Sequence, residues 1–489
     1  MRSLTFFPRL ALVAIALSFL AFGHAQSGSN QKKNILLICV DDLRPELNSF
    51  GVNYIHSPNI DRLAASGRAF HRHYVNAPTC GASRYTMLTG QYGSYGNQAL
   101  FQRAERLKSI DSTIPPSMPE LFRRNGYKTV SVGKVSHHPG GWGGEDWYDH
   151  NVLEMPGAWD RQLMPTGQWK HPRGAMHSLI HGEIKPIGSF SENKMDVMQS
   201  AEGKDTDYHD GLIAVEGLEQ LENLAESHTP FFLAIGFIKP HLPFGAPKRY
   251  MDPYEAIELP PIPHPEKPDW QSTWHASGEF TNQYYHYGKD PNVNEEYAEQ
   301  VRKHYAGCVS YVDHHVGLIL AKLEETGRDK DTIVVLWGDH GWHLGEHAIW
   351  GKHCLFEEAL RSPFIISVPG MNSPGTKTDA VVETLDLFPT LCELTGLDHP
   401  EFVHGTSLVP QIKNPNAKGH TAYAYTGRAR TIRNASHRLT IHNDGYAELY
   451  DHTSPEKETK NVAGQNPAVV KALTALINQK ERLNKMDRP

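Results

Sequence analysis

The sequence predicts an α/β fold: a large, mostly parallel central sheet flanked by helices, with a smaller antiparallel sheet and a closing helix at the carboxyl end. Residues 34–40, NILLICV, form a nearly continuous apolar run, which is typical of a strand buried on both faces of a parallel sheet. Helical segments then alternate with further apolar runs, and this alternation indicates an α/β sheet. The 489 residues suffice for one large core and a smaller companion.

The predicted helices and strands repeat in a regular order. After the first strand, the segment SPNIDRLAASG offers Ser57 as a helix cap, Pro58 at the first helical position and Gly67 past the end. A helix followed by a strand is expected again in three later segments, at 117–134, 211–237 and 311–338.

Two regions interrupt the alternation and are expected to be surface insertions. Residues 140–196 are rich in Trp, Gly and His, and residues 251–292 are rich in Pro and aromatic side chains. Long ordered loops are usually lids or walls of functional sites, and irregular packing around small aromatic clusters is the equal alternative. Past residue 400, short alternating runs precede a helical segment at 466–483. We therefore expect a main α/β domain at 26–399 and an α+β subdomain at 400–489.

The amino-terminal residues are typical of a secretory signal. Arg2 and Arg9 precede the apolar run 10–22 and the small residues around 23–25, which is the order of a signal peptide over residues 1–25. A membrane anchor is the alternative, but the run is too short to span a bilayer comfortably. We expect an exported protein, periplasmic or secreted, with no stable membrane insertion after cleavage.

Charge and cysteine content narrow the function further. The formal net charge of −7 argues against a general binder of nucleic acids, so an anionic substrate would need a local basic pocket. Five cysteines are few and odd in number for an exported chain and imply no disulfide framework. Cys39, Cys308 and Cys392 are expected to be core thiols, whereas Cys354 stays open. Cys80 stands among Pro, Thr, Gly, Ala and Ser, and we expect it to be exposed at the start of a helix.

Polar clusters directly follow four of the predicted strands. In open α/β sheets, ligands bind beyond the carboxyl ends of the strands, so segments at these ends can meet in one crevice. Each cluster alone would be the ordinary start of a solvated loop, whereas four together favour a functional site. The clusters are Asp41 with Asp42, Lys134 with His137 and His138, Lys239 with His241, and Asp339 with His340.

Three of these side chains are the carboxylates of Asp41, Asp42 and Asp339, which would repel one another without a counter-ion. A divalent cation resolves the repulsion, and oxygen ligands favour calcium or magnesium. The imidazole of His340 leaves zinc or manganese open. The alternative is that the carboxylates pair with nearby Arg or Lys side chains.

Cations and proton carriers accompany the carboxylates, and this combination suits the transfer of a tetrahedral oxyanion. Cys80 precedes Arg84 by four residues. On a helix that begins near residue 82 or 83, the arginine reaches back toward the cysteine, and the helix amino end favours an anion. Cys80 therefore stands where a nucleophile would stand. The candidate cations are Arg84, Lys134 and Lys352, and the candidate proton carriers are His137 and His241.

The segment CGASRYTMLTG at 80–90 closely resembles the sulfatase signature, in which the cysteine is followed by Pro or Ala two positions later, then Ser-Arg, with Leu-Thr-Gly downstream. SPNIDRLAASGRAF at 57–70 and AELYDHTSPEKETKNVA at 447–463 resemble other segments of the same family. The chain is similar throughout to a type I, formylglycine-dependent sulfatase of the alkaline phosphatase superfamily. Within it, DDLRPEL, GKVSHHPGG, KPHLPF and GDHGWHLGEHAIWGKH resemble the iduronate-2-sulfatase branch most.

The resemblance implies an enzyme in which Cys80 is oxidised after translation to formylglycine, whose hydrate supplies the nucleophilic oxygen. It implies one calcium ion per chain and, as partners, a sulfated glycan and a formylglycine-generating or anaerobic maturation enzyme. Histidine replaces the asparagine of many sulfatases at position 340, and it stays open which of the adjacent His137 and His138 faces the site. The implied metal ligands are Asp41, Asp42, Cys80, Asp339 and His340. The implied catalytic residues are Cys80, Arg84 for the hydrate, Lys134 and Lys352 for the sulfate, His241 as proton donor and His137 as base.

The predicted activity is therefore the hydrolysis of carbohydrate sulfate esters by an exported enzyme, with 2-O-sulfated uronate as the expected group. Trp142 and Trp147, together with the KPHLPF loop at 239–244, are expected to wall the crevice. A phosphodiesterase or phosphonate monoester hydrolase of the same superfamily and a catalytically inactive glycan-binding homologue are the alternatives.

Overall fold

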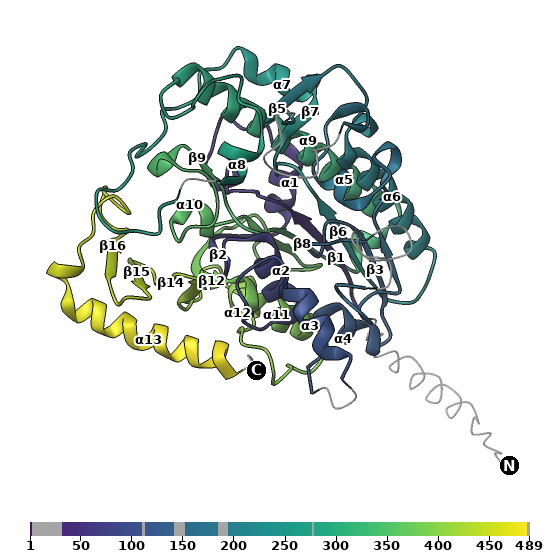
Figure 1. Ribbon diagram of the computed structural model, residues 1–489. Coiled ribbons are helices and arrows are strands. Elements are labelled where there is room, and N and C mark those ends of the chain that lie inside the picture. Colours follow the sequence, from purple (N-terminus) through teal and green to yellow (C-terminus); the bar gives the residue numbers. More distant parts are fainter. Residues whose placement is uncertain (2–31, 110–112, 141–151, 184–193, 276–277, 487–489) are drawn as a thin grey trace. The chain divides into compact units, whose positions relative to one another are not determined.

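An eight-stranded sheet lies at the centre of the computed structural model (Figure 1), which describes residues 1, 32–109, 113–140, 152–183, 194–275 and 278–486. Strand β11 is antiparallel to both of its neighbours, and the other adjacent pairs are parallel. The predicted mostly parallel sheet is thus confirmed. In spatial order its strands are β12 (Thr378–Glu383), β2 (Arg68–Tyr74), β11 (Phe364–Ser367), β8 (Thr332–Gly338), β1 (Asn34–Val40), β6 (Phe231–Phe237), β3 (Lys128–Gly133) and β4 (Arg161–Leu163).

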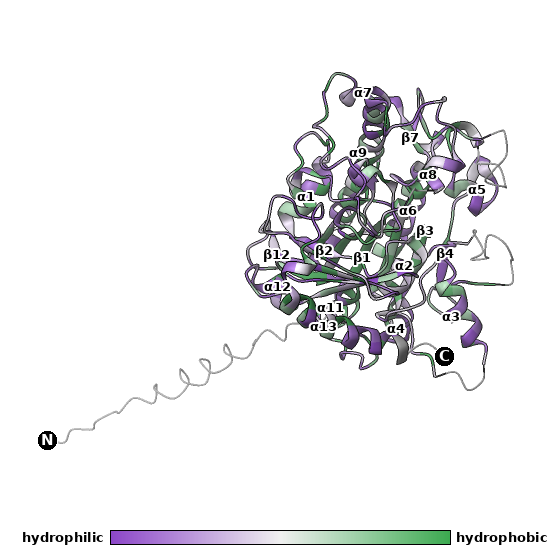
Figure 2. Ribbon diagram, turned by 60° about the vertical axis from the view of Figure 1, so that its left-hand side comes forward, coloured by the Kyte–Doolittle hydropathy of each residue, from purple (hydrophilic) through white to green (hydrophobic). Residues whose placement is uncertain are grey.

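Helices cover both faces of this sheet, because alternate side chains of each buried strand point to opposite sides. Leu36 and Ile38 of β1 pack with helices α1 (Pro58–Ser66), α6 (His209–Ala225) and α9 (Glu295–Glu325). Ile35 and Leu37 pack on the other side with α2 (Cys80–Thr89), α4 (Met118–Arg124) and α11 (Leu387–Thr395). Figure 2 shows the resulting hydrophobic layer along the strands and the hydrophilic outer surfaces of the helices.

A second sheet of four antiparallel strands follows near the carboxyl end, as predicted, and α13 (Pro467–Met486) closes it. Its core includes Tyr423, Leu439 and Leu473, and Ala82 and Tyr92 from the α2 region join the same cluster. Residues Lys33–Pro489 group as one compact unit. This grouping does not test the predicted domain boundary between residues 399 and 400, which stays a prediction. The strands are β13 (Ala422–Tyr425), β14 (Ala429–Arg433), β15 (His437–His442) and β16 (Ala447–Asp451).

The structure differs locally from two expectations. Residues 161–163, within the predicted insertion 140–196, form the edge strand β4 and pair with β3. Ser57, Pro58 and Gly67 take the predicted positions at the ends of α1, but the side chain of Ser57 bonds no amide of the helix. The carboxylate of Asp313 in α9 takes that role, since it accepts the amides of Asn59 and Ile60 at 3.0 and 2.7 Å. Within the described residues, no helix is both long and apolar enough to cross a membrane.

Candidate active site

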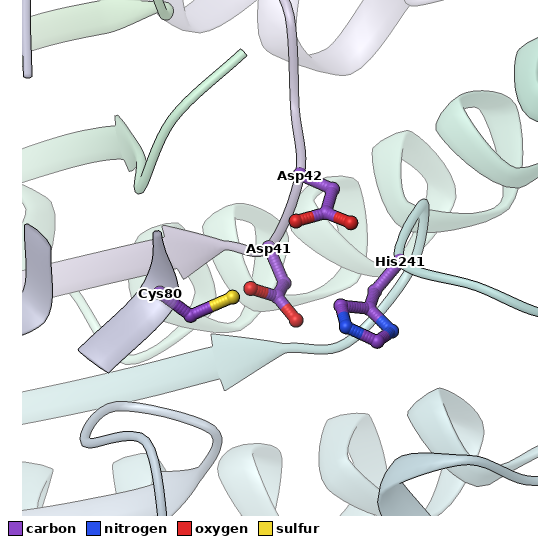
Figure 3. A group of neighbouring side chains, drawn as sticks. All are labelled: Asp41, Asp42, Cys80 and His241. Atoms are coloured by element: carbon purple, nitrogen blue, oxygen red, sulfur yellow. The ribbon is translucent and has the colours of Figure 1, made fainter. Parts of the chain in front are cut away.

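The four predicted polar clusters meet at one edge of the central sheet. Strands β8, β1, β6 and β3 are consecutive neighbours and mutually parallel, so the segments that follow them leave the sheet on the same side. The prediction that these segments converge is therefore confirmed. Figure 3 shows the side chains of Asp41, Asp42, Cys80 and His241 pointing toward one another from β1, α2 and the loop after β6.

The chain turns sharply at Asp42, whose backbone φ is 56°. Asp residues tolerate this left-handed conformation better than most other residues. The Asp42 amide donates to Oδ1 of Asp339 at 2.9 Å, and the hydroxyl of Tyr305 donates to the Asp42 carbonyl at 2.8 Å. The first bond holds the loop after β1 to the loop after β8, and the second holds it to α9. Together they direct the carboxylates of Asp42 and Asp339 into the site.

Cys80 is the first residue of α2, so the helix begins two to three residues earlier than predicted. The expectation of an exposed cysteine was wrong, because only 2% of its surface is accessible. The following Gly81 is required by packing, since a Cβ there would lie 2.3 Å from the Cα of Asn97. The Sγ atom lies 3.3 Å from Nε2 of His340 and 3.4 Å from Nζ of Lys352. Cys80 is thus a buried group at the base of a cavity.

The thiol of Cys80 is held in its neutral form. Burial raises its pKa well above the ordinary value and the nearby Asp41 carboxylate adds to this, whereas Lys352 and Lys134 oppose it. A neutral thiol is a poor nucleophile, because the thiolate is the reactive form of cysteine. The unmodified side chain is therefore poorly suited to nucleophilic attack in this position.

Arg84 lies fully buried beneath Cys80 and joins two of the carboxylates. Its Nη2 is 3.0 Å from Oδ1 of Asp41, and its Nε donates to Oδ2 of Asp339 at 3.0 Å. Its Nη1 donates to the carbonyls of Lys134 and Val135. The guanidinium therefore fixes three of the loops that carry the site.

Both lysines pair with carboxylates of the cluster, and Nζ of Lys352 also lies 3.7 Å from Oε2 of Glu279. Nζ of Lys134 binds Oδ2 of Asp41, and Nζ of Lys352 lies 2.7 and 3.0 Å from the carboxylate oxygens of Asp42. The alternative that Arg and Lys side chains pair with the carboxylates is thus realised in this structure. Burial disfavours the charge of Asp41, yet Lys134, His241 and Arg84 hold its pKa well below the usual range.

These ion pairs leave the negative charges of two carboxylates, Asp42 and Asp339, incompletely compensated. Burial raises the pKa of Asp42 well above its usual value, Lys352 opposes this, and Asp41 and Asp339 add to it. Burial and the Asp41 carboxylate likewise raise the pKa of Asp339 to about 7 against the effect of Arg84. A further cation at this place would relieve both.

His340 is oriented as a metal ligand would be. Its Nδ1 lies 2.9 Å from the Gly341 carbonyl, so Nδ1 carries the proton and Nε2 presents a lone pair. Burial and Lys352 lower its pKa well below the ordinary value. Nε2 nevertheless lies 3.3 Å from Oδ1 of Asp42, two acceptors facing each other. One ligand atom from each of Asp41, Cys80, Asp339 and His340 falls within 4.8 Å of the others, and this donor set fits a divalent cation.

The histidines stand on the walls above this cluster. Burial and the ammonium of Lys134 lower the pKa values of both His241 and His137 well below the ordinary range. Nε2 of His241 faces Oε1 of Glu279 at 3.5 Å. His137 and His138 both line the cavity, and the amide of His138 donates to Glu154.

A cavity of about 580 Å³ opens above Cys80. Five of the predicted residues line it, namely Cys80, Lys134, His137, His241 and Lys352, whereas the predicted Asp41, Asp42, Arg84, Asp339 and His340 lie buried beneath them. The sequence analysis missed further lining residues, many of them on α5 (Pro172–Met176) and α8 (Gly278–Gln283) within the two insertions. These are Asn97, Gln98, Arg173, Met176, His177, Glu279, Asn282, Gln283 and His353. Trp142 and Trp147 lie outside the described residues.

The remaining cysteines are free and buried. Cys39 and Cys392 pack in the core on the α2 side of the sheet, and Cys308 packs on the α9 side, so their predicted role as core thiols is confirmed. Cys354 is fully buried near His343, with Sγ 3.8 Å from Nδ1.

A buried thiol, a carboxylate cluster and two lysines beyond the carboxyl edge of an α/β sheet define a hydrolase for esters of tetrahedral oxyanions. The chain matches the family described as Sulfatase over residues 33–397 and that described as N-sulphoglucosamine sulphohydrolase, C-terminal, over residues 345–486. It belongs to the Sulfatase family and is a sulfuric ester hydrolase.

Relatives and solved structures agree with this family. Iduronate 2-sulfatase of Mus musculus is 32% identical over 442 residues, which cover 82% of this chain and 74% of that protein. The phosphonate monoester hydrolase of Agrobacterium radiobacter has a TM-score of 0.74 at 21% identity and covers 93% of this chain and 96% of its own. A 2-O GAG sulfatase has a TM-score of 0.63 at 22% identity, with 93% of each chain covered. The predicted sulfatase-like fold is confirmed.

Proposed function

We propose that this sulfatase removes the sulfate of 2-O-sulfated uronate residues in a sulfated glycan, with a formylglycine derived from Cys80 and one calcium ion. The observation that carries the proposal is the position of Cys80. Its Sγ stands at the base of the cavity within 3.4 Å of both His340 and Lys352. This position, together with the signature segment at 80–90, supports the conversion of Cys80 to another nucleophile.

The oxidised residue would supply an oxygen nucleophile from its aldehyde hydrate. Calcium, held by Asp41, Asp42, Asp339, His340 and residue 80, would supply positive charge for the developing sulfate oxyanion. The three carboxylates and the oxygen of the modified residue 80 fit calcium. Nε2 of His340 presents its lone pair toward Asp42, and this arrangement supports a cation between the two side chains.

The other side chains would bind the sulfate, transfer protons and orient the carboxylates. Lys134 and Lys352 line the cavity as cations and would bind the sulfate oxygens. His241 also lines it and would protonate the departing alcohol from its imidazolium form, which the Glu279 carboxylate facing its Nε2 would favour. His137 would act as the base that regenerates the nucleophile. Arg84 is buried among the carboxylates and would orient them and residue 80.

The cavity wall supports a charged sugar as the substrate. Its lining includes the polar side chains of Arg173, His177, Asn282 and Gln283, whose donors suit a carboxylate and hydroxyl groups. A volume of about 580 Å³ is in the range of small-ligand sites. The likeness to iduronate 2-sulfatase and to a 2-O GAG sulfatase points to the same class of ester.

We further infer that the protein is exported and matured by a separate formylglycine-forming enzyme. The order of charge, apolar run and small residues at 1–25 supports export. The segment 78–90 carries the sequence that such an enzyme would read.

The test compares kcat/KM on four esters: a 2-O-sulfated uronate disaccharide, a glycan sulfated elsewhere, an aryl sulfate and a phosphate diester. We expect the first to be preferred by at least about tenfold, or 1.4 kcal/mol of transition-state stabilisation. Equal efficiency on the aryl ester would refute the carbohydrate assignment, and a preference for the diester would favour a phosphodiesterase or phosphonate monoester hydrolase. Peptide mass spectrometry that finds only cysteine at position 80 in active protein would refute the formylglycine.

A further inference from the structure

A second group of potential metal ligands lies between α9 and the turn before α6, outside the residues that line the catalytic cavity. His314 and His315 are adjacent in α9, and Asp205 comes from the short turn Asp205–Asp207 before α6. One ligand atom from each of the three side chains falls within 4.8 Å of the other two. Nε2 of His314 is 3.6 Å from Oδ2 of Asp205. Two imidazoles and a carboxylate from separate elements thus converge on one point.

His315 is the anomalous member of this group. It is 1% exposed, stacked on Phe237 and edge-on to Tyr311, with ring centroids 6.0 and 4.5 Å away. Neither of its ring nitrogens has a hydrogen-bond partner among the described residues. A buried polar group without a partner is energetically unfavourable, and among the described residues the lone pair of His315 accepts no hydrogen bond.

The carboxylate of Asp205 is already oriented by a neighbour. Arg249 pairs with Oδ1 of Asp205 and donates to the Gly203 carbonyl at 2.8 Å. This leaves Oδ2 directed at His314. Ligating carboxylates in metal sites are commonly held by such outer hydrogen bonds. The side chains of His314 and Asp205 are 43% and 22% exposed, so an ion reaches them from solvent.

We propose that Asp205, His314 and His315 form a second metal site, selective for zinc and similar borderline cations. Two nitrogen donors and one oxygen favour zinc over calcium, which prefers six or more oxygens. Ligand atoms of a tetrahedral zinc site lie roughly 3.3–3.5 Å apart. The 3.6 Å between His314 and Asp205 is already close to this, and the exposed His314 ring can rotate to complete the geometry. The site would tie α9 to the loop before α6.

The test titrates the full-length, matured enzyme with Zn²⁺ by calorimetry in an excess of Ca²⁺, which occupies the oxygen-rich cluster near Cys80. Co²⁺ is used in parallel, because its visible absorption reports nitrogen ligation in a tetrahedral site. The variants are His315→Gln and Asp205→Asn. The matched control is His304→Gln on the same helix, where the ring bonds the Gln300 carbonyl at 2.8 Å instead.

We expect saturable Zn²⁺ binding by the wild type and the His304 control, weakened at least tenfold in both cluster variants, with the Co²⁺ bands lost in His315→Gln. If His315→Gln fails to fold, Asp205→Asn and His314→Gln decide the question, because both positions are partly exposed. Absence of saturable binding in the wild type overturns the proposal. So does equal affinity in the cluster variants and the control, since that result assigns the ion to another site.

Discussion

Replacing Arg84 by methionine is expected to destabilise the protein by about 3–5 kcal/mol, the usual cost of removing one partner of a buried ion pair. The guanidinium is fully buried and contacts Asp41 and Asp339 at 2.9–3.0 Å, and both carboxylates are equally buried. Methionine fills a similar volume but leaves both charges without this partner. The loss should therefore come from unpaired charge, with little contribution from an empty space.

The assay is urea unfolding with linear extrapolation to water, done in calcium and in chelator. The control is Arg62→Met, because Arg62 pairs with Glu324 at 2.9 Å on the surface, with side chains 48% and 55% exposed. An exposed pair of this kind contributes at most about 1 kcal/mol. We expect the Arg84 variant to lose more stability in chelator than in calcium. A loss of less than about 1 kcal/mol, equal to that of the control, would refute the view that Arg84 neutralises the buried carboxylates.

Four further outcomes are expected. Cys80→Ala should abolish turnover and shift the free energy of unfolding by no more than about 2 kcal/mol, and Cys80→Ser should fail wherever maturation needs the thiol; near wild-type turnover in either variant would contradict the mechanism. Removal of the divalent metal should abolish turnover, and calcium should restore it, whereas full activity with unchanged stability in stripped protein would count against a metal. Glu279→Gln should lower kcat several-fold with a smaller change in KM, because the carboxylate faces Nε2 of His241 at 3.5 Å; an effect on KM alone would assign it to binding. Burial lowers the pKa of His420, but the Asp386 carboxylate at 2.8 Å raises it to about 9. This pair therefore stabilises the fold fully below about pH 6.5 and less as the pH rises through 9. An unchanged pH dependence of unfolding in His420→Gln would contradict this.

The parts of the site that follow strands could be predicted from the sequence. A buried parallel strand is often a continuous apolar run, so its end is visible, and Asp41 and Asp339 come directly after such runs, whereas Lys134 follows the alternating segment KTVSVG. Parallel strands deliver their ends to one edge, so the edge can be predicted, whereas the meeting in one site depends on β8, β1, β6 and β3 being neighbours, which the sequence does not show. The identity of the nucleophile depended on the family signature at residues 80–90.

The parts that depend on contacts between distant segments could not be predicted. Asp313 caps α1 across 254 positions of sequence, and local rules therefore assigned the cap to Ser57. The cavity walls on α5 and α8 come from regions without regular periodicity, where no strand end marks the site. The burial of Cys80 was also missed. Small polar neighbours in the sequence indicate exposure only when no distant segment covers them, and here Lys352 and His340 cover Cys80.

The two readings of the carboxylate cluster, ion pairs or a metal site, are not alternatives in this structure. Three cations contact the three carboxylates, yet compensation is uneven: Lys134 and Arg84 keep Asp41 ionised, whereas the pKa values of Asp42 and Asp339 are raised, chiefly by burial. Nε2 of His340, which carries the lone pair, lies 3.3 Å from Oδ1 of Asp42. The incompletely compensated charge thus belongs to Asp42 and Asp339, both of which lie near Cys80. A divalent ion bound there would neutralise those two carboxylates, and Lys134 and Lys352, which line the cavity, would then have charge to offer a sulfate.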